Sequence, residues 1–66
     1  MVEDWITVDP DVCHGKPIIR GTRIMVANVL SLLAGGSTIA QILEYYPELS
    51  REAVEGALEY AVAVAG

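Results

Sequence analysis

The sequence predicts a small, mainly α-helical protein in which three helices form a helix-turn-helix bundle behind a short N-terminal β arm or hairpin. Apolar residues recur at helical spacing in three separate stretches from residue 26 onward. Glycine and proline separate these stretches by short connections, which place successive helices side by side at an angle. Before residue 26, by contrast, short β-type runs alternate with turn-forming dipeptides.

The length of the chain limits what the fold can contain. Its 66 residues are enough for one domain, which we divide into an extended arm (1–25) and a three-helix unit (26–66). A domain of this size buries only about 60% of the surface that its unfolded chain exposes, so we expect marginal stability without association. Cys13 is the only cysteine and His14 the only histidine, which rules out an internal disulfide and a four-ligand zinc site. We expect no bound metal or cofactor.

The charge balance and the N-terminal residues indicate a cytoplasmic protein. Four basic residues face nine acidic ones, and the net charge of −5 opposes nonspecific attraction to nucleic acid. The first residues, Met1–Asp4, are acidic where a signal peptide is basic. The longest apolar run, Ala61–Ala65, is too short to cross a bilayer. We therefore expect a location in the cytoplasm, which suits a reduced Cys13, and no membrane partner.

The extended arm contains two β-type runs, Trp5–Val8 and Pro17–Arg20. Between them, Asp9–Lys16 has the composition of a turn. Arg23–Val26 fits either a third strand or the approach to the first helix, and the sequence leaves both interpretations open.

The first helix is predicted from Val26 to Leu33, with Asn28 and Ser31 on the face opposite the apolar one. Gly35-Gly36 ends this helix, because glycine is favoured just past the last apolar turn. The apolar positions of the helix are Val26, Val29, Leu30 and Leu33.

The second helix starts at Ser37 or Thr38. Thr38 with Gln41 matches a capping box, in which the side chain of each residue satisfies a backbone N–H of the other. Pro47 forces the end of the helix, because a proline ring disfavours helical conformation at the residue before it. The apolar positions of the helix are Ile39, Ile42, Leu43 and Tyr46.

The third helix begins at Ser50, a favourable N-cap, and runs to about Ala65. Leu49 and Val54 stand at the two positions of a hydrophobic staple. The turn Pro47–Ser50 has the length of a helix-turn-helix corner, which Leu49 is suited to fill. An ordinary three-helix packing with no nucleic-acid role fits this topology equally well, because fold does not fix function.

The third helix carries more apolar surface than one core requires. A first stripe is expected to close the core, and a second stripe beside it indicates burial on another side. We predict that this second side meets another chain, which makes the protein a homodimer or a higher assembly. The alternative is that the arm folds over this side and that Trp5 covers it. The first stripe is Val54, Leu58, Ala61 and Ala65, flanked by Ala57 and Val62, and the second is Ala53, Tyr60 and Val64, with Gly56 at its edge.

Basic residues are the candidates for contacts with nucleic acid. Lys16, Arg20 and Arg23 lie within eight residues of the arm, where they are placed to track a phosphate backbone. Arg51 lies at the N-terminal end of the third helix, where a helix-turn-helix protein reads bases. That helix has an acidic exposed face, so we expect weak DNA binding, carried by the arm; pairing of Arg20 and Arg23 with carboxylates is the alternative. The acidic residues of the face are Glu52, Glu55 and Glu59.

No residue pattern indicates catalysis. Gly15-Lys16 lacks the spacing of a phosphate-binding loop, and Pro17 stands where that loop needs Ser or Thr. Cys13 and His14 are adjacent, and adjacent residues of an extended segment point to opposite faces, so they form no catalytic pair. A chain this short also leaves little room for a pocket of several hundred Å³. We therefore expect no enzyme activity and no small-molecule substrate.

Several separated motifs make the chain similar to a known family. They are G-K-P-I-I-R-G-T-R-I at Gly15–Ile24, the helix end at Gly35–Ser37, Y-P-E-L-S at Tyr46–Ser50 and A-L-E-Y-A at Ala57–Ala61. In their order and spacing they resemble the domain of unknown function 433 family of bacterial and archaeal antitoxin-like proteins. The resemblance covers nearly the whole chain.

The resemblance implies a homeodomain-like, winged-helix-related fold of three helices. It also implies the antitoxin of a type II toxin–antitoxin pair, which dimerises, binds a PIN-like nuclease toxin encoded nearby and represses its own operon. A dimeric adaptor module with no nucleic-acid role is the alternative function. The family's signature positions, which we expect to set the turn into the first helix with Thr22 or Arg23 as its anchor, are Gly15, Lys16, Pro17, Gly21, Thr22 and Arg23.

Overall fold

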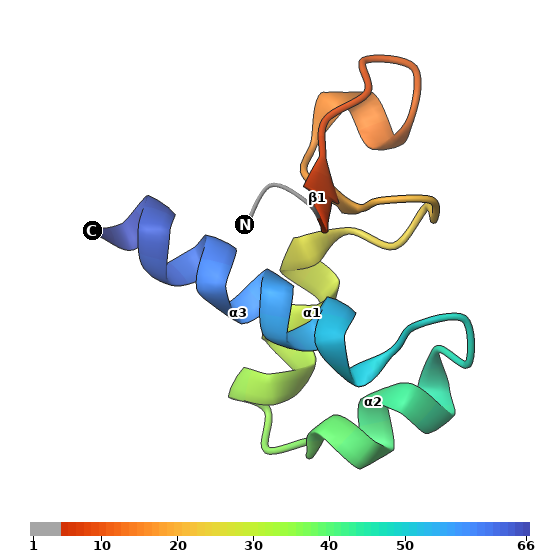
Figure 1. Ribbon diagram of the computed structural model, residues 1–66, viewed down its shortest axis with the longest axis vertical. Coiled ribbons are helices and arrows are strands. Elements are labelled where there is room, and N and C mark those ends of the chain that lie inside the picture. The colour runs from red at the N-terminus through yellow and green to blue at the C-terminus, as the bar shows by residue number, and fades with distance from the viewer. Residues whose placement is uncertain (1–4) are drawn as a thin grey trace.

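The computed structural model describes residues 5–66 and confirms the predicted fold class, a mainly helical protein with three helices and an N-terminal two-stranded antiparallel hairpin (Figure 1). Its elements in chain order are β1 (Ile6–Thr7), η2 (Cys13–Gly15), β2 (Ile18–Ile19), α1 (Val26–Ala34), α2 (Ile39–Tyr45) and α3 (Arg51–Ala65). The hairpin and its turn lie at one end of the molecule and α2 lies at the other, with α1 and α3 between them (Figure 1). Within residues 5–66, no helix is long and apolar enough to cross a membrane.

The arm folds back on itself twice. β1 pairs antiparallel with β2, in a register that places Ile6 opposite Ile19. Beyond β2 the chain turns at Gly21, and Met25 then forms an isolated β-bridge with Ile18. Helix α1 follows immediately, so the third β-type run is both a short extended pairing and the approach to the first helix.

Cys13 and His14 lie in a left-handed turn, as the composition of Asp9–Lys16 predicts, so our expectation that they behave as neighbours in an extended segment is wrong. Their φ angles are 52° and 57°, and Gly15 continues the turn with a φ of 77°. Local hydrogen bonds impose this conformation, because the Gly15 N–H donates to the Val12 carbonyl at 3.1 Å and the next N–H closes a second such ring. The Cys13 thiol donates to the Arg23 carbonyl at 3.4 Å, which ties the turn to the segment before α1.

Local signals fix the ends of α1 and α2. Gly36 has a φ of 101°, and the Ser37 N–H donates to the Leu32 carbonyl at 3.0 Å, which gives α1 a Schellman-type end. Thr38, and not Ser37, caps α2, because its hydroxyl accepts a hydrogen bond from the Gln41 N–H at 3.1 Å. The Gln41 side chain accepts one in return from the Thr38 N–H at 2.8 Å, so the predicted capping box is complete.

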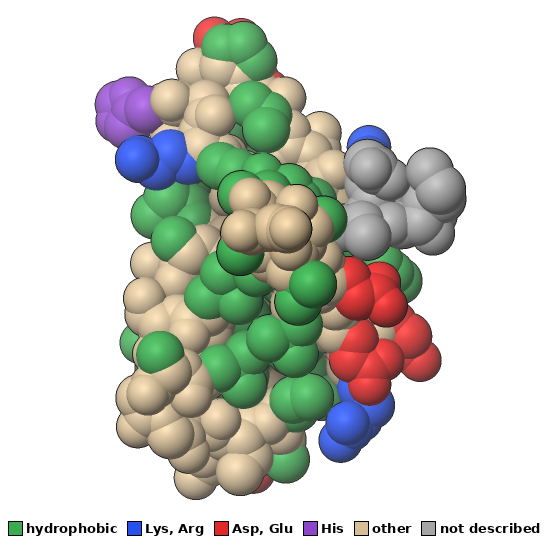
Figure 2. Space-filling view, turned by 90° about the vertical axis from the view of Figure 1, so that its left-hand side faces the viewer, with side chains coloured by type: hydrophobic (Ala, Val, Ile, Leu, Met, Phe, Trp, Pro, Cys, Tyr) green, Lys and Arg blue, Asp and Glu red, His purple; other side chains and the backbone are tan. Residues whose placement is uncertain are grey.

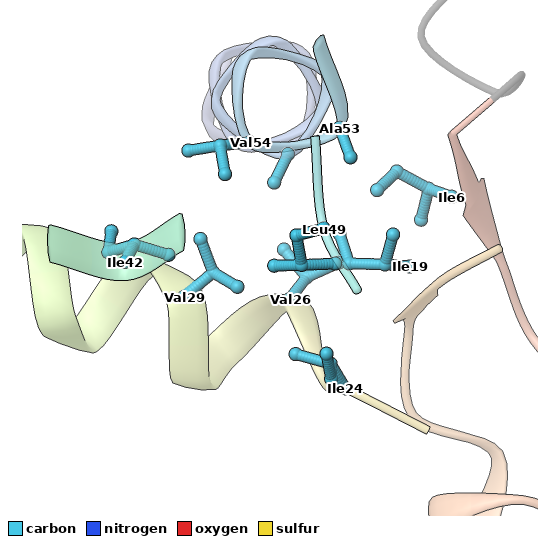
Figure 3. Packing of buried hydrophobic residues seen from close by; sticks show 10 residues of the cluster. Ile6, Ile19, Ile24, Val26, Val29, Ile42, Leu49, Ala53 and Val54 are labelled. Atoms are coloured by element: carbon cyan, nitrogen blue, oxygen red, sulfur yellow. The ribbon is translucent and has the colours of Figure 1, made fainter. Parts of the chain in front are cut away.

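The core lies where the three helices meet the hairpin (Figure 3). Val29 of α1, Ile42 of α2 and Val54 of α3 converge there, and Ile19 of β2 joins them from the side of the arm. Leu49, in the turn between α2 and α3, is also buried, so it fills the helix-turn-helix corner as its place in the sequence predicts.

The two predicted stripes of α3 are not divided between core and partner in the way that we expected. Four residues of the N-terminal half are buried, and they come from both stripes. The C-terminal half extends beyond the rest of the fold, as the left-hand end of α3 in Figure 1 shows, so apolar residues of both stripes are exposed there. For the apolar residues of the two stripes, burial therefore changes along the helix and not from one stripe to the other. The buried residues are Ala53, Val54, Gly56 and Ala57, and the exposed ones include Leu58, Val62, Val64 and Ala65.

Candidate protein-binding surface

The exposed apolar side chains of α3 form the most distinctive surface of the molecule. We name Leu58, Tyr60, Val62 and Val64 the α3 apolar end. Val62 is 73% exposed and Val64 is 67% exposed, although valine is among the residues that are most often fully buried. Figure 2, in which the C-terminal end of α3 points toward the viewer, shows hydrophobic side chains around this end and along the surface below it. The exposure of so many apolar side chains makes the end of α3 the candidate interaction site.

A groove runs from the α3 apolar end to α1. Its volume is about 290 Å³, and Lys16 is the charged residue in a lining that is otherwise apolar or aromatic. Our expectation that so short a chain leaves little room for a pocket of several hundred Å³ is therefore wrong, because the sides of two helices and the arm form this groove without enclosing it. We name it the α1–α3 groove. Its lining includes Pro17, Met25, Ala27, Leu30, Tyr60 and Val64.

The arm covers the other part of the second stripe. A Cβ atom added at Gly56 would lie 2.6 Å from Cδ1 of Trp5, so the indole rests directly on the backbone of α3. Ala53 is only 3% exposed and points toward Ile6 of β1 (Figure 3). Ala53 therefore belongs to the core and is not available to a partner, whereas Tyr60 and Val64 line the α1–α3 groove. Trp5 itself stays partly exposed at the edge of this contact.

The four basic residues named as candidates for DNA contacts are exposed, but the structure does not gather them into one patch. Lys16 lines the α1–α3 groove, and Arg20 donates from Nη2 to the Ile6 carbonyl at 3.3 Å. Arg51 lies 3.9 Å from the Glu55 carboxylate on the next turn of α3. On the face drawn in Figure 2, basic side chains form separated groups, and acidic ones gather mainly on the right-hand side, with others at the top and bottom edges.

The family's signature positions build the turn that leads into α1. The Thr22 hydroxyl donates to the Ile19 carbonyl at 2.8 Å and accepts from the Ile24 N–H at 3.0 Å. Gly21 before it has a φ of 81°, which glycine adopts without strain. The Pro17 carbonyl accepts from the Val26 N–H at 3.0 Å, which satisfies one of the free donors at the start of α1. These residues hold the arm and the first helix together.

A second pocket, which the sequence does not predict, lies between α1 and α2. Its volume is about 380 Å³, and we name it the α1–α2 pocket. The rings of Tyr45 and Tyr46 meet edge to face, with centroids 4.8 Å apart and planes at 81°. The sequence shows two consecutive tyrosines and a polar face on the first helix. Only the packing of α2 on α1 brings the tyrosines and this polar face together. The lining residues are Asn28, Ser31, Leu32, Tyr45 and Tyr46.

Comparison with known proteins identifies the family. The family described as "Protein of unknown function (DUF433)" matches residues 6–61, which is most of the chain. The chain belongs to the DUF433 family. The boundaries of the match agree with the resemblance that the separated motifs indicate.

Two relatives of this DUF433 protein show how much of it is shared. An uncharacterized protein of Sinorhizobium fredii, y4eO, is 38% identical over 58 residues, which are 88% of this chain and 26% of the relative. The crystal structure of a DUF433 member from Anabaena variabilis superposes with a TM-score of 0.82 at 33% identity, covering 91% of this chain and 59% of that one. The DUF433 chain thus spans about a quarter of the length of the first relative and just under three fifths of the second.

Proposed function

We propose that this DUF433 protein is a non-catalytic, antitoxin-like binding module. It associates with a second copy of itself through the α3 apolar end, and it holds a nuclease-like toxin encoded beside its gene. The observation that carries the proposal is the exposure of Val62 and Val64 on a helix whose N-terminal half is buried. A domain that leaves this much aliphatic surface in water gains stability when another protein covers it.

The chemistry of the two pockets supports a binding role over an enzymatic one. Asp, Glu, His and Cys, which supply most general acids, bases and nucleophiles, are absent from the linings of the α1–α2 pocket and the α1–α3 groove. The hydroxyl groups of the α1–α2 pocket and the Lys16 amine of the α1–α3 groove therefore have no carboxylate or imidazole beside them in these linings to activate them as nucleophiles.

Association through the α3 apolar end is tested by sedimentation. We expect the 66-residue chain to have a mass well above 7.1 kDa at micromolar concentration. The double variant Val62→Glu/Val64→Glu should sediment as a monomer, because burial of two carboxylates in an apolar contact is costly. Val8→Glu is the matched control, since Val8 is 57% exposed but lies outside the α3 apolar end, and it should leave the mass unchanged. A monomeric parent chain, or dissociation by the control variant as well, contradicts the proposed surface.

Toxin binding is tested with the nuclease-like protein encoded beside the gene. Its RNase activity should fall when this chain is added in equimolar amount. Undiminished nuclease activity, together with an intact dimer, would rule out the antitoxin role and support the alternative of a dimeric adaptor with no nucleic-acid role. That alternative is favoured by one specific observation, the separation of the basic side chains on a protein of net charge −5.

A further inference from the structure

The α1–α2 pocket combines a corner of two aromatic rings with polar side chains that have no hydrogen-bond partner in the described part of the chain. Tyr45 is 69% exposed, although Tyr46 next to it packs against the core. Their perpendicular rings form a corner, and a corner of two aromatic rings is shaped for a small apolar group with flat sides. The pocket therefore has an apolar corner between the two rings, and no side chain of residues 5–66 fills it.

Polar groups surround this aromatic corner. Asn28 and Ser31 project from the exposed face of α1, and each tyrosine adds a hydroxyl. Within residues 5–66, no hydrogen bond joins any of these four side chains to another residue. The amide and the three hydroxyls are all able to donate. A ligand that offers several free acceptors beside a compact ring would satisfy the whole pocket.

A proline-rich segment in the polyproline II conformation has this chemistry. Its backbone forms no internal hydrogen bonds, so its carbonyl groups are free to accept from the pocket. Its pyrrolidine rings fit aromatic-lined grooves, and its preformed conformation lowers the entropy lost on binding. A helical ligand would bring carbonyl groups that are already paired, and a strand would need a sheet edge, which is not part of this pocket.

Charge selects among proline-rich segments. The pocket contains no Lys or Arg, and exposed carboxylates occur at Glu44 and Glu48, beside the two tyrosines in the sequence. Stacking of nucleobases on the tyrosines would bring phosphates to a pocket with no lining cation, on a protein of net charge −5. We propose that the α1–α2 pocket binds a basic, proline-rich segment of a partner protein. This site is separate from the α3 apolar end, so the two proposals can fail independently.

The proposal is tested by nuclear magnetic resonance titration of the isotopically labelled 66-residue chain. The probe is a capped peptide of three Lys-Pro-Pro repeats, and its controls are the Glu-Pro-Pro and Lys-Ala-Ala peptides of the same length. Amide shifts should be confined to the α1–α2 pocket and should occur with the Lys-Pro-Pro peptide alone. Tyr45→Ala should raise the Kd of the Lys-Pro-Pro peptide at least about tenfold, as truncation of a central aromatic contact does. Val8→Ala, at an exposed position outside both the pocket and the α3 apolar end, should change the Kd by less than about twofold.

Several outcomes overturn the proposal. Equal binding of the Glu-Pro-Pro peptide removes the role of charge, and equal binding of Lys-Ala-Ala removes the role of proline. Binding of a short oligothymidylate in the pocket would identify nucleic acid as the ligand class. Shifts of the pocket amides with protein concentration, without peptide binding, would show that a second copy covers the pocket. If none of the peptides binds while Val62→Glu/Val64→Glu dissociates the assembly, this inference fails and the proposed function stands.

Discussion

A methyl group added at Gly56 would change how α3 packs against the arm. Glycine in a helix interior is less favourable than alanine by about 1 kcal/mol, so its presence in α3 needs a reason. The reason is the indole of Trp5, which occupies the space where a Cβ atom would lie. The residue is therefore required by the packing of the arm and not by the helix that contains it.

The contact between Gly56 and Trp5 predicts a double-mutant cycle. Gly56→Ala should lower the free energy of unfolding by about 1–2 kcal/mol, because overpacking costs more than the gain in helix propensity returns. In a Trp5→Gly background, which also removes the Cβ atom that lies 2.8 Å from the added methyl group, the same substitution should instead raise this free energy by about 1 kcal/mol, since only the propensity gain remains. Urea unfolding of the four chains measures both effects. An equal loss of stability in the two backgrounds would show that the indole is not the obstacle.

At the scale of the elements, the helix ends depend on caps that act within a few residues. Ser50 is one of them, since its hydroxyl accepts a hydrogen bond from the Ala53 N–H at 3.2 Å at the start of α3. Ser50→Ala should lower the free energy of unfolding by about 1 kcal/mol. Ser31→Ala is the matched control, because Ser31 is exposed inside α1 and alanine favours a helix interior there, so stability should be unchanged or slightly higher. If Ser50→Ala lowers the free energy of unfolding no more than Ser31→Ala does, the cap has no such role.

This local control explains which elements the sequence can predict. The Gly36, Thr38 and Ser50 signals lie beside the ends that they determine, so the helix boundaries can be predicted without tertiary information. The division of α3 into a buried and an exposed half cannot, because it depends on where β1 and Trp5 lie after the arm folds back. The α1–α2 pocket is hidden for the same reason, since Asn28 and Tyr45 become neighbours only through helix packing.

At the scale of the whole molecule, net charge and its distribution govern contacts with DNA. The chain carries −5, its acidic α3 face is exposed, and one of the basic side chains of the arm, Arg20, also serves the hairpin. Electrostatic attraction to phosphates is therefore small, and any contact from the arm carries little sequence information.

We predict that the duplex upstream of the gene and a random duplex bind equally weakly. The salt dependence should be no steeper than a slope of about −2.7 per subunit, which corresponds to one phosphate each for Lys16, Arg20 and Arg23. Arg51→Ala should leave binding unchanged. Fluorescence anisotropy across a salt series provides the measurement. Tight binding that prefers the upstream duplex and is lost in Arg51→Ala would instead show that α3 reads bases.

The division of α3 into a buried half and a protruding half has a consequence for how such proteins diverge. Substitutions at Ala53 or Val54 affect the stability of the fold, because these residues are buried. Substitutions at Val62 or Val64 change the surface that the chain presents to other proteins. We therefore expect duplicated genes to acquire different partners through changes in the last turns of one helix while the scaffold stays intact. Two paralogues in one cell could then avoid cross-pairing without any change in their common architecture.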